Sequence, residues 1–233
     1  MLRAVLFDFN GVLVDDLDVH TRLLGGVLEE EGLPAAPARD LDTARNDRDV
    51  LAAVLEREGR PHDPVSVNRL VARKAGRYQE HARRHGYPFY PGVLELVEGA
   101  ARQGLMLGIV SGALREEIVQ ALQQSGLRRH FKAIVSAEDV RRGRPNPEIY
   151  RRALEELNHQ PPLPERLVHP HEVLAVENSP MGLAAAAQAG LVSLGVAHRH
   201  ELCQLLTASG AVSSLADVDP HDLQRIFAEA SQR

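Results

Sequence analysis

The sequence predicts an α/β fold, a doubly wound, mostly parallel Rossmann-like sheet with an all-helical cap inserted into it. From residue 87 onward, short apolar runs alternate with amphipathic segments, which is typical of βαβ units. Residues 16–87 show helical periodicity and no convincing strand pattern. Polar residues directly follow several apolar runs, where open parallel sheets bind their ligands. We therefore expect a core of residues 1–15 and 88–233 and a helical cap of residues 16–87.

The first apolar run, residues 4–7, is expected to be a buried strand, because strands inside parallel sheets are almost continuously hydrophobic. Asp8 stands at its carboxyl end. Asn10-Gly11 then predicts a tight turn, since glycine takes positive φ without steric cost. Hydrophobic spacing and stop signals predict three cap helices, over residues 17–32, 47–58 and 65–85.

The second part of the chain is expected to supply the remaining strands and their crossover helices. Asn146 and Ser179 are predicted N-cap residues, each followed by a proline at the first helical position. The predicted strands are 104–110, 131–135, 173–176 and 191–196, and the predicted helices are 92–101, 115–124 and two that begin at Pro147 and Pro180.

Composition excludes several classes of protein. Hydrophobic residues make up 44% and charged residues 25%, which is ordinary for a globular chain. The net charge of −5 and the scattered arginines argue against nucleic-acid binding. Cys203 is the single cysteine, so an intramolecular disulfide and multi-cysteine metal sites are excluded. No run approaches the roughly 20 apolar residues of a membrane helix, and the first apolar run is too short for a signal peptide; we expect a cytoplasmic protein without membrane partners.

Asp8-Phe9-Asn10-Gly11-Val12-Leu13 resembles the opening motif of the haloacid dehalogenase superfamily, in which a nucleophilic Asp follows a buried strand and a second Asp comes two residues later. From its residues alone, the stretch could also be an Asx turn that ends a strand. An EF-hand loop is excluded, because Gly11 comes too early for that spacing.

Three further stretches resemble the remaining motifs of this superfamily, in the required order. Ser111-Gly112 resembles the phosphate-binding Ser/Thr motif, although a serine here could equally cap a helix. Residues 142–150 resemble Gly-Lys-Pro-x-Pro-x-x-Tyr and place Arg144 at the catalytic Lys; a solvated basic loop is the alternative. Glu177-Asn178 resembles the acidic pair that holds Mg²⁺, with a simple capped helix as the alternative.

This resemblance, to the β-phosphoglucomutase-like and phosphatase subgroup with a helical cap, implies a Mg²⁺-dependent phosphatase of a small phosphorylated metabolite. Its reaction would pass through an aspartyl-phosphate on Asp8. The implied catalytic residues are Asp8, Asn10, Ser111 and Arg144, the implied phosphate-binding residues are Ser111, Gly112 and Arg144, and the implied metal ligands are Asp8, Asn10 through its carbonyl, Glu177 and Asn178.

Three residues depart from the family pattern. Asn10 replaces the acid–base Asp and has no carboxyl proton to donate. Proton transfer by such an acid typically accelerates a reaction 10²–10⁴-fold, so this part of the catalytic rate is in doubt. Asn178 replaces an acid, so we expect weaker Mg²⁺ binding. Arg144 keeps the charge of Lys but changes its geometry. A catalytically weakened protein that binds a phosphorylated ligand, or a phosphomutase, is therefore an alternative, whereas dehalogenation is disfavoured by Asn10.

The cap gives two more candidates. His20, after Asp15-Asp16, resembles a residue at the start of such caps, and Arg48 lies where related caps carry a substrate-specificity loop. Arg48 would contact a distal phosphate of the substrate; a solvated charge at a helix start is the alternative. The His169/His171 and His198/His200 pairs have no acidic or cysteine partners at ligand spacing, so we do not expect a transition-metal site.

Overall fold

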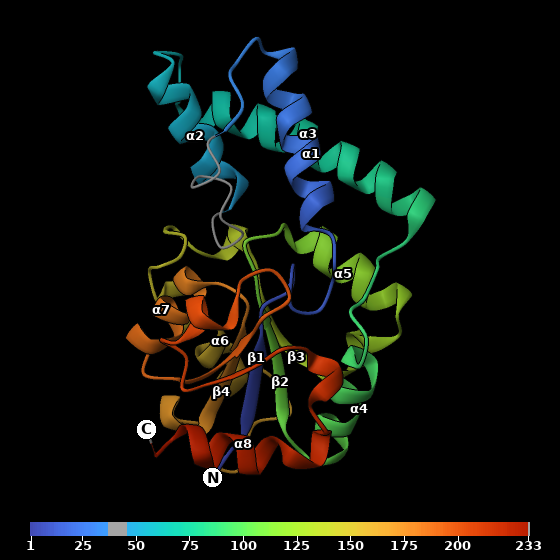
Figure 1. Ribbon diagram of the computed structural model, residues 1–233, viewed down its shortest axis with the longest axis vertical. Helices are drawn as coiled ribbons and strands as arrows, with labels where there is room; N and C mark the ends of the chain where they lie inside the picture. The colour runs from blue at the N-terminus through green and yellow to red at the C-terminus, as the bar shows by residue number, and fades with distance from the viewer. Residues whose placement is uncertain (37–45, 233) are drawn as a thin grey trace.

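A six-stranded parallel sheet forms the centre of the fold (Figure 1), and the predicted fold class is confirmed. The computed structural model describes residues 1–36 and 46–232. The strands lie in the order β3-β2-β1-β4-β5-β6, with β1 between β2 and β4. Their bounds are β1 Ala4–Phe7, β2 Met106–Val110, β3 Phe131–Val135, β4 Val173–Glu177, β5 Val192–Val196 and β6 Gly210–Val212.

Alternate residues of β1 enter two hydrophobic clusters, one on each face of the sheet. Val5 and Phe7 pack with α4, α5 and α8, whereas Ala4 and Leu6 pack with α6 and α7. Because both faces are covered, β1 and β4 are buried along their whole length. The helices are α4 Val93–Arg102, α5 Arg115–Gln124, α6 Glu148–His159, α7 Pro180–Gln188 and α8 Leu223–Ala230.

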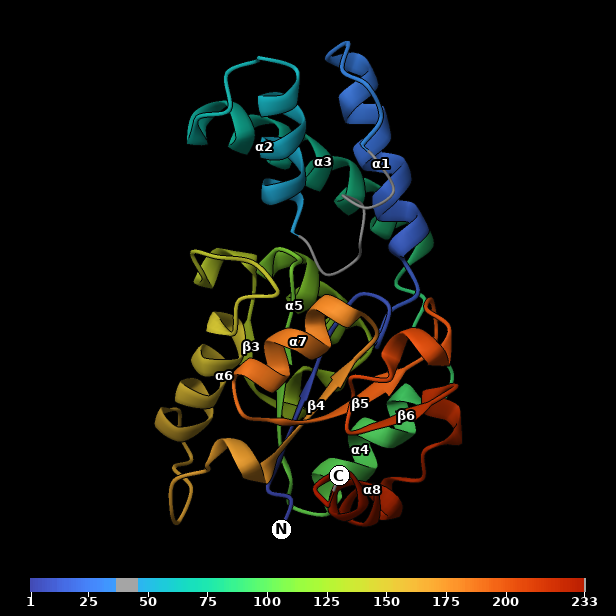
Figure 2. The ribbon, with the colours of Figure 1, turned by 60° about the vertical axis from the view of Figure 1, so that its left-hand side comes forward.

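Three further helices form a helical lobe: α1 Leu17–Glu30, α2 Asp47–Arg57 and α3 Pro64–His85. Figures 1 and 2 show this lobe over the carboxyl ends of the strands, with both chain termini at the opposite end of the molecule. The lobe has its own hydrophobic cluster, drawn from all three helices. The predicted boundary at residues 16–87 stays a prediction, although it brackets these helices.

The two connections between the sheet and the helical lobe run side by side. The Asp15 N–H donates to the Pro88 carbonyl (2.7 Å), and the Tyr90 N–H donates to the Leu13 carbonyl (2.9 Å). Val14 and Phe89 form an antiparallel bridge between them. The chain therefore leaves and re-enters the core at one place, directly beyond the carboxyl end of β1.

The structure corrects some predicted elements. Helix α6 begins at Glu148, one residue later than expected, with Pro147 as N-cap; the Asn146 side chain accepts the Glu148 N–H at 3.0 Å. Strand β2 begins at Met106, because Gly104 is still in a turn with φ of 76°. Strand β6 and helix α8 have no counterpart in the prediction.

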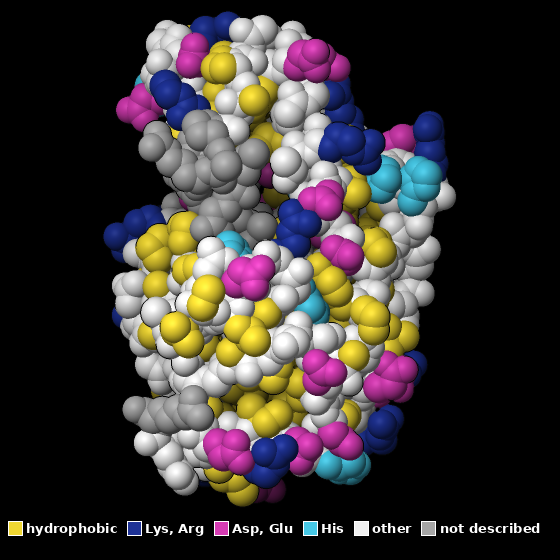
Figure 3. Space-filling view, in the orientation of Figure 1, with side chains coloured by type: hydrophobic (Ala, Val, Ile, Leu, Met, Phe, Trp, Pro, Cys, Tyr) yellow, Lys and Arg dark blue, Asp and Glu magenta, His cyan; other side chains and the backbone are white. Residues whose placement is uncertain are grey.

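One face of the molecule carries charged side chains of both signs. On the face in Figure 3, the coloured Lys and Arg side chains are interspersed with Asp and Glu and form no continuous basic stripe. Within the described parts of the chain, every helix is too short or too polar to cross a bilayer.

Candidate active site

The predicted site residues follow three neighbouring strands. Asp8 follows β1, Ser111 follows β2, and Glu177-Asn178 ends β4, so all of them meet at one edge of the sheet. The Asp8 N–H donates to the Val176 carbonyl at 2.9 Å, which continues the pairing with β4 past the end of β1. All four side chains are almost completely buried.

Arg144 reaches this edge from the loop before α6. Its Nη2 donates to Asp8 Oδ1 and to the Val110 carbonyl, both at 3.0 Å, and lies 3.0 Å from Glu177 Oε1. Burial raises the pKa of the Asp8 carboxyl, while the Arg144 charge and hydrogen bond oppose that rise. The solvated basic loop is therefore excluded, since the guanidinium is buried against the predicted nucleophile.

The contacts of Arg144 with Asp8, Val110 and Glu177 all use one of its three guanidinium nitrogens, Nη2. Its Nε and Nη1 are buried without a hydrogen-bond partner in the described part of the chain. A planar guanidinium presents its donors as a fork that matches the oxygens of a phosphoryl group. Beside it, the Ser111 hydroxyl accepts the Ala113 N–H (3.0 Å) and donates to Asn10 Oδ1 over a long 3.4 Å. Ser111 is not the N-cap of α5, because Leu114 holds that position.

Glu177 and Asn178 keep unused polar atoms inside the site. Glu177 Oε1 contacts the Tyr150 hydroxyl and Arg144, whereas Oε2 has no hydrogen-bond partner among residues 1–36 and 46–232. Burial raises the pKa of Glu177 to about 8, with Arg144 opposing the rise. The amide oxygen and nitrogen of Asn178 are also buried without a hydrogen-bond partner in these ranges.

Two glycines make room for these side chains. A Cβ on Gly182, in the first turn of α7, would lie 1.9 Å from Glu177 Oε2. A Cβ on Gly11 would lie 1.9 Å from Asn178 Nδ2, and Gly11 also has a positive φ of 79°. The predicted Asn-Gly turn is thus confirmed, and it needs glycine for space as well as for conformation.

The donor set fits a hard cation but carries little charge. In the described ranges, no three His, Cys, Asp or Glu side chains are grouped to hold a metal ion. The available oxygens are one carboxylate on Asp8, the Asn10 carbonyl, and the unpartnered oxygens of Glu177 and Asn178. Oxygen ligands of this kind suit Mg²⁺. Because the side chain of Asn178 is an amide, only two of these groups are acids, and both contact Arg144.

The Asn10 side chain is held by a carboxylate of the helical lobe. Its Nδ2 lies 2.9 and 3.0 Å from the two oxygens of Asp16. Asp16 also accepts from the Tyr78 hydroxyl and lies 3.3 Å from His20 Nε2. Burial acts to raise the pKa of Asp16, but His20, Tyr78 and Asn10 outweigh it and hold this pKa below its usual value. An ionised carboxylate thus holds the Asn10 amide from the side of the helical lobe.

Sequence reasoning missed this network. Besides Asp16 and Tyr78, it includes Lys74, whose Nζ lies 2.7 Å from Asp47 Oδ2 and contacts His20 Nδ1. Lys74 is almost fully buried, at 1% exposure. One signal was present: Lys74 stands in the apolar stripe of α3, three residues after Val71 and four before Tyr78. A charged residue at such a position needs buried partners.

The two cap candidates occupy different places. His20 joins the Asn10–Asp16 network but does not reach Asp8. Arg48 is exposed on the first turn of α2, next to Asp47, whose carboxylate faces Lys74. Adjacent helical residues point in different directions, so Arg48 is turned away from that side chain. Its predicted role toward a distal phosphate stays a prediction, and Arg45 of the same stretch lies outside the described residues.

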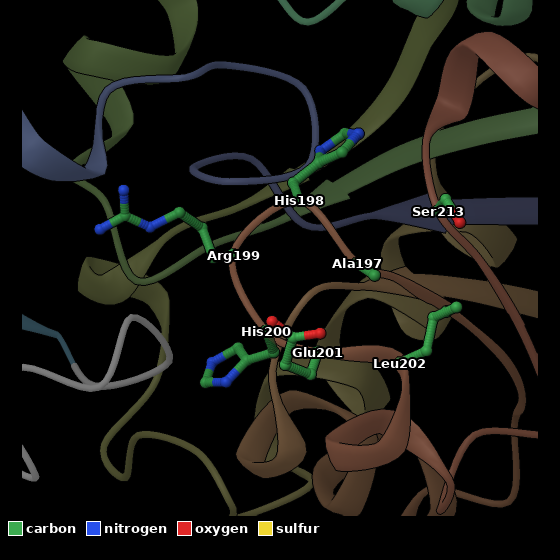
Figure 4. A pocket seen from close by; sticks show the side chains of 7 residues that line it. All are labelled: Ala197, His198, Arg199, His200, Glu201, Leu202 and Ser213. Carbon is green, nitrogen blue, oxygen red and sulfur yellow. The ribbon is translucent and has the colours of Figure 1, made fainter.

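His169 and His171 precede β4, at the end of that strand away from Glu177, whereas His198 lies beside the turn after β1. His198 and His200 line an open pocket of about 290 Å³ and point away from each other (Figure 4). The His198 Nδ1 lies 3.1 Å from the Gly11 carbonyl, and its ring stacks on Tyr90. Arg199, in the same loop, forms an ion pair with Asp18 of α1 (2.7 Å). The loop after β5 therefore contacts both the turn after β1 and the helical lobe.

A sequence model described as haloacid dehalogenase-like hydrolase matches residues 5–196 of the chain. The chain belongs to this family. A phosphorylated carbohydrates phosphatase from Thermotoga maritima is 28% identical over 98% of this chain and 99% of its own length. Among solved structures, a β-phosphoglucomutase from Clostridium difficile has a TM-score of 0.84 at 20% identity, over the full length of both chains. CbbY from Rhodobacter sphaeroides, crystallised with phosphate, has a TM-score of 0.78 at 24% identity and is covered to 96%, against 93% of this chain.

Proposed function

We propose that this protein is a Mg²⁺-dependent phosphatase of small phosphorylated metabolites that uses Asp8 as its nucleophile. The observation that carries the proposal is Arg144, which binds Asp8 through one nitrogen and keeps two buried donors unused beside Ser111. Family membership and the T. maritima phosphatase support the same reaction class. The helical lobe would act as the cap over the bound substrate.

In the proposed reaction, an oxygen of the Asp8 carboxylate attacks phosphorus, and the bond from phosphorus to the leaving oxygen breaks. Water then attacks the aspartyl-phosphate, which releases phosphate and restores the carboxylate. Nε and Nη1 of Arg144 and the Ser111 hydroxyl would bind the phosphoryl oxygens. Mg²⁺, held by Asp8, the Asn10 carbonyl, Glu177 and Asn178, would add positive charge against the phosphoryl oxygens.

The leaving group decides how fast the first step runs. Asn10 stands where the family has its acid, and its amide cannot protonate an alkoxide. A nitrophenolate leaves without a proton, whereas a sugar alkoxide needs one. We therefore expect aryl phosphates to react faster than sugar phosphates. The second candidate is a protein that binds a phosphorylated ligand without turnover. It is favoured by the presence of an amide, rather than an acid, at Asn10.

The assay that tests the proposal compares 4-nitrophenyl phosphate with glucose 6-phosphate, with Mg²⁺ and with EDTA. We expect nitrophenol release with Mg²⁺, loss of this activity in EDTA, recovery when Mg²⁺ is restored, and slower hydrolysis of the sugar phosphate. If neither compound releases phosphate, although both bind in calorimetric titration, the phosphatase proposal is wrong and the binding protein is correct.

Replacing Asn178 with Asp is expected to tighten Mg²⁺ roughly 10-fold, because an added ligand charge strengthens a hard-cation site. The substitution keeps the side-chain size beside Gly11, and the oxygen concerned has no partner to lose. Calorimetric titration of Mg²⁺ measures the change. Asn68→Asp, at an exposed position of α3, is the control for the same change in net charge. Equal affinities in the two variants would mean that Asn178 does not face the metal.

A further inference from the structure

Three charged side chains at the boundary between the helical lobe and α5 have no part in the proposed chemistry. We call Asp47 of α2, Lys74 of α3 and Glu117 of α5 the distal cluster. Lys74 and Glu117 are 1% and 2% exposed, so both are shielded from solvent although they come from different layers of the molecule. Charged residues are seldom buried to this degree unless they are paired.

The pairing in the distal cluster is incomplete. The Lys74 ammonium lies 2.7 Å from Asp47 Oδ2, contacts His20 Nδ1 and stands 5.8 Å from the centre of the Tyr78 ring. Glu117 uses Oε2 to accept the Leu114 N–H at 3.3 Å. Among the residues that the structure describes, its Oε1 is buried without a hydrogen-bond partner, and Glu117 forms no ion pair with Lys74. An unused acceptor and a buried ammonium thus face the same boundary.

Electrostatics supports this placement of Glu117. Burial raises the pKa of its carboxyl, Lys74 and His20 oppose the rise, and Asp47 adds to it. All three of these neighbours belong to the helical lobe, whereas Glu117 belongs to the core. Glu117 is therefore close enough to the helical lobe for the charges of that lobe to act on it.

A continuous set of polar contacts joins the distal cluster to the phosphoryl site. Ser111 contacts Asn10 at 3.4 Å, Asn10 Nδ2 lies 3.2 Å from His20 Nε2, and His20 contacts Lys74. The two sites also approach each other through the start of α2. Asn46, the N-cap of this helix, lines a small cavity with Ser111, Gly112 and Arg144, and Asp47 is the next residue. The distal cluster is thus linked to the phosphoryl site through Asn10 and His20, and Asp47 directly follows a residue that lines the cavity at Ser111 and Arg144.

We propose that the distal cluster binds the non-phosphorylated end of the substrate and selects monophosphates with a hydroxyl-bearing far end over bisphosphates. This inference rests on the proposed phosphatase function. A hydroxyl group can donate to Glu117 Oε1 and accept from Lys74, which satisfies both. A second phosphate would bring a charge of about −1.5 to −2 toward two carboxylates, one of which already neutralises Lys74.

The test measures kcat/KM for D-sorbitol 6-phosphate, D-fructose 1,6-bisphosphate and 4-nitrophenyl phosphate. We expect the wild type to prefer sorbitol 6-phosphate to the bisphosphate. Glu117→Gln should lower the ratio of kcat/KM for sorbitol 6-phosphate to that for 4-nitrophenyl phosphate by roughly 10-fold, because it weakens a charged hydrogen bond. Glu116→Gln, the same change at the exposed neighbouring residue, is the control and should leave this ratio unchanged.

Asp47→Asn supplies a second, less buried variant. It leaves the Lys74 ammonium without its counter-charge, so kcat/KM for the bisphosphate should rise relative to that for sorbitol 6-phosphate. Wild-type ratios in both variants, with circular dichroism showing a native fold, would overturn the inference.

If the wild type hydrolyses none of the three compounds, the phosphatase function itself is wrong. Calorimetric affinities of the same two sugar phosphates for the wild type and Glu117→Gln then decide the inference. A preference for the monophosphate that Glu117→Gln reduces would support it, and equal affinities or no binding would overturn it.

Discussion

Asp8→Asn is expected to lower the hydrolysis of 4-nitrophenyl phosphate by roughly 10⁴-fold or more, because removal of a nucleophile costs that order of rate. The amide keeps the shape of the carboxylate and an oxygen that can accept from Phe9 N–H and Arg144. The fold should therefore persist. Initial rates and thermal unfolding, measured on the same samples, separate the loss of chemistry from a loss of stability.

The control for this variant is Asp15→Asn, which changes an exposed carboxylate seven residues further along the chain. It should keep wild-type activity. A phosphoryl group on the peptide that contains Asp8, found by mass spectrometry after acid quenching of the wild type and absent from Asp8→Asn, would support the covalent step. Hydrolysis by Asp8→Asn near the wild-type rate would rule out Asp8 as the nucleophile.

Asn10→Asp is expected to raise turnover of alkyl phosphates such as sorbitol 6-phosphate by about 10²–10⁴-fold, and that of aryl phosphates far less. Asn10 Nδ2 lies within 3.0 Å of both oxygens of Asp16. A carboxyl oxygen in its place would face an ionised carboxylate, and two carboxylates at this distance share a proton. The new carboxyl at position 10 therefore holds a proton that it can donate to the leaving oxygen. The wild-type amide has no such proton.

The double variant Asn10→Asp with Asp16→Asn tests this explanation, because it has the new carboxyl without its charged neighbour. Its activity on alkyl phosphates should decline at lower pH than that of the single variant. Steady-state rates for both substrate types across pH 5 to 9 give the comparison. No gain on alkyl phosphates in Asn10→Asp would mean that this side chain does not approach the leaving oxygen.

The sequence was informative wherever structure depends on local pattern. Apolar runs such as residues 4–7, followed by a polar residue, predicted both the strands and the site residues at their ends. Asp8, Ser111 and Glu177 come together because their strands are neighbours in a parallel sheet. Strand β6 escaped prediction because it is three residues long and only partly buried, so it leaves no apolar run.

Contacts that depend on how the helical lobe packs could not be predicted in the same way. The partner of Asn10 is Asp16, whose position is fixed by Tyr78 of α3, far away in the sequence. Similarly, a cation was expected at Arg144, but no pattern indicates that a single nitrogen would serve Asp8, Val110 and Glu177 while two nitrogens remain free. Such details follow from three-dimensional proximity, which spacing along the chain does not encode.

The adjacent connections at Leu13–Asp15 and Pro88–Tyr90 have a consequence for how such a protein can diverge. An insertion whose two ends are hydrogen-bonded to each other imposes no strain on the sheet, so a different insertion with the same end spacing can occupy the same place. Asp47 and Lys74 of the distal cluster belong to the inserted segment, whereas Asp8, the proposed nucleophile, and Arg144 belong to the core. If the proposed function is correct, exchange of the inserted segment would change which substrate is recognised. It would leave Asp8 and Arg144, which are proposed to act on the phosphoryl group, unchanged.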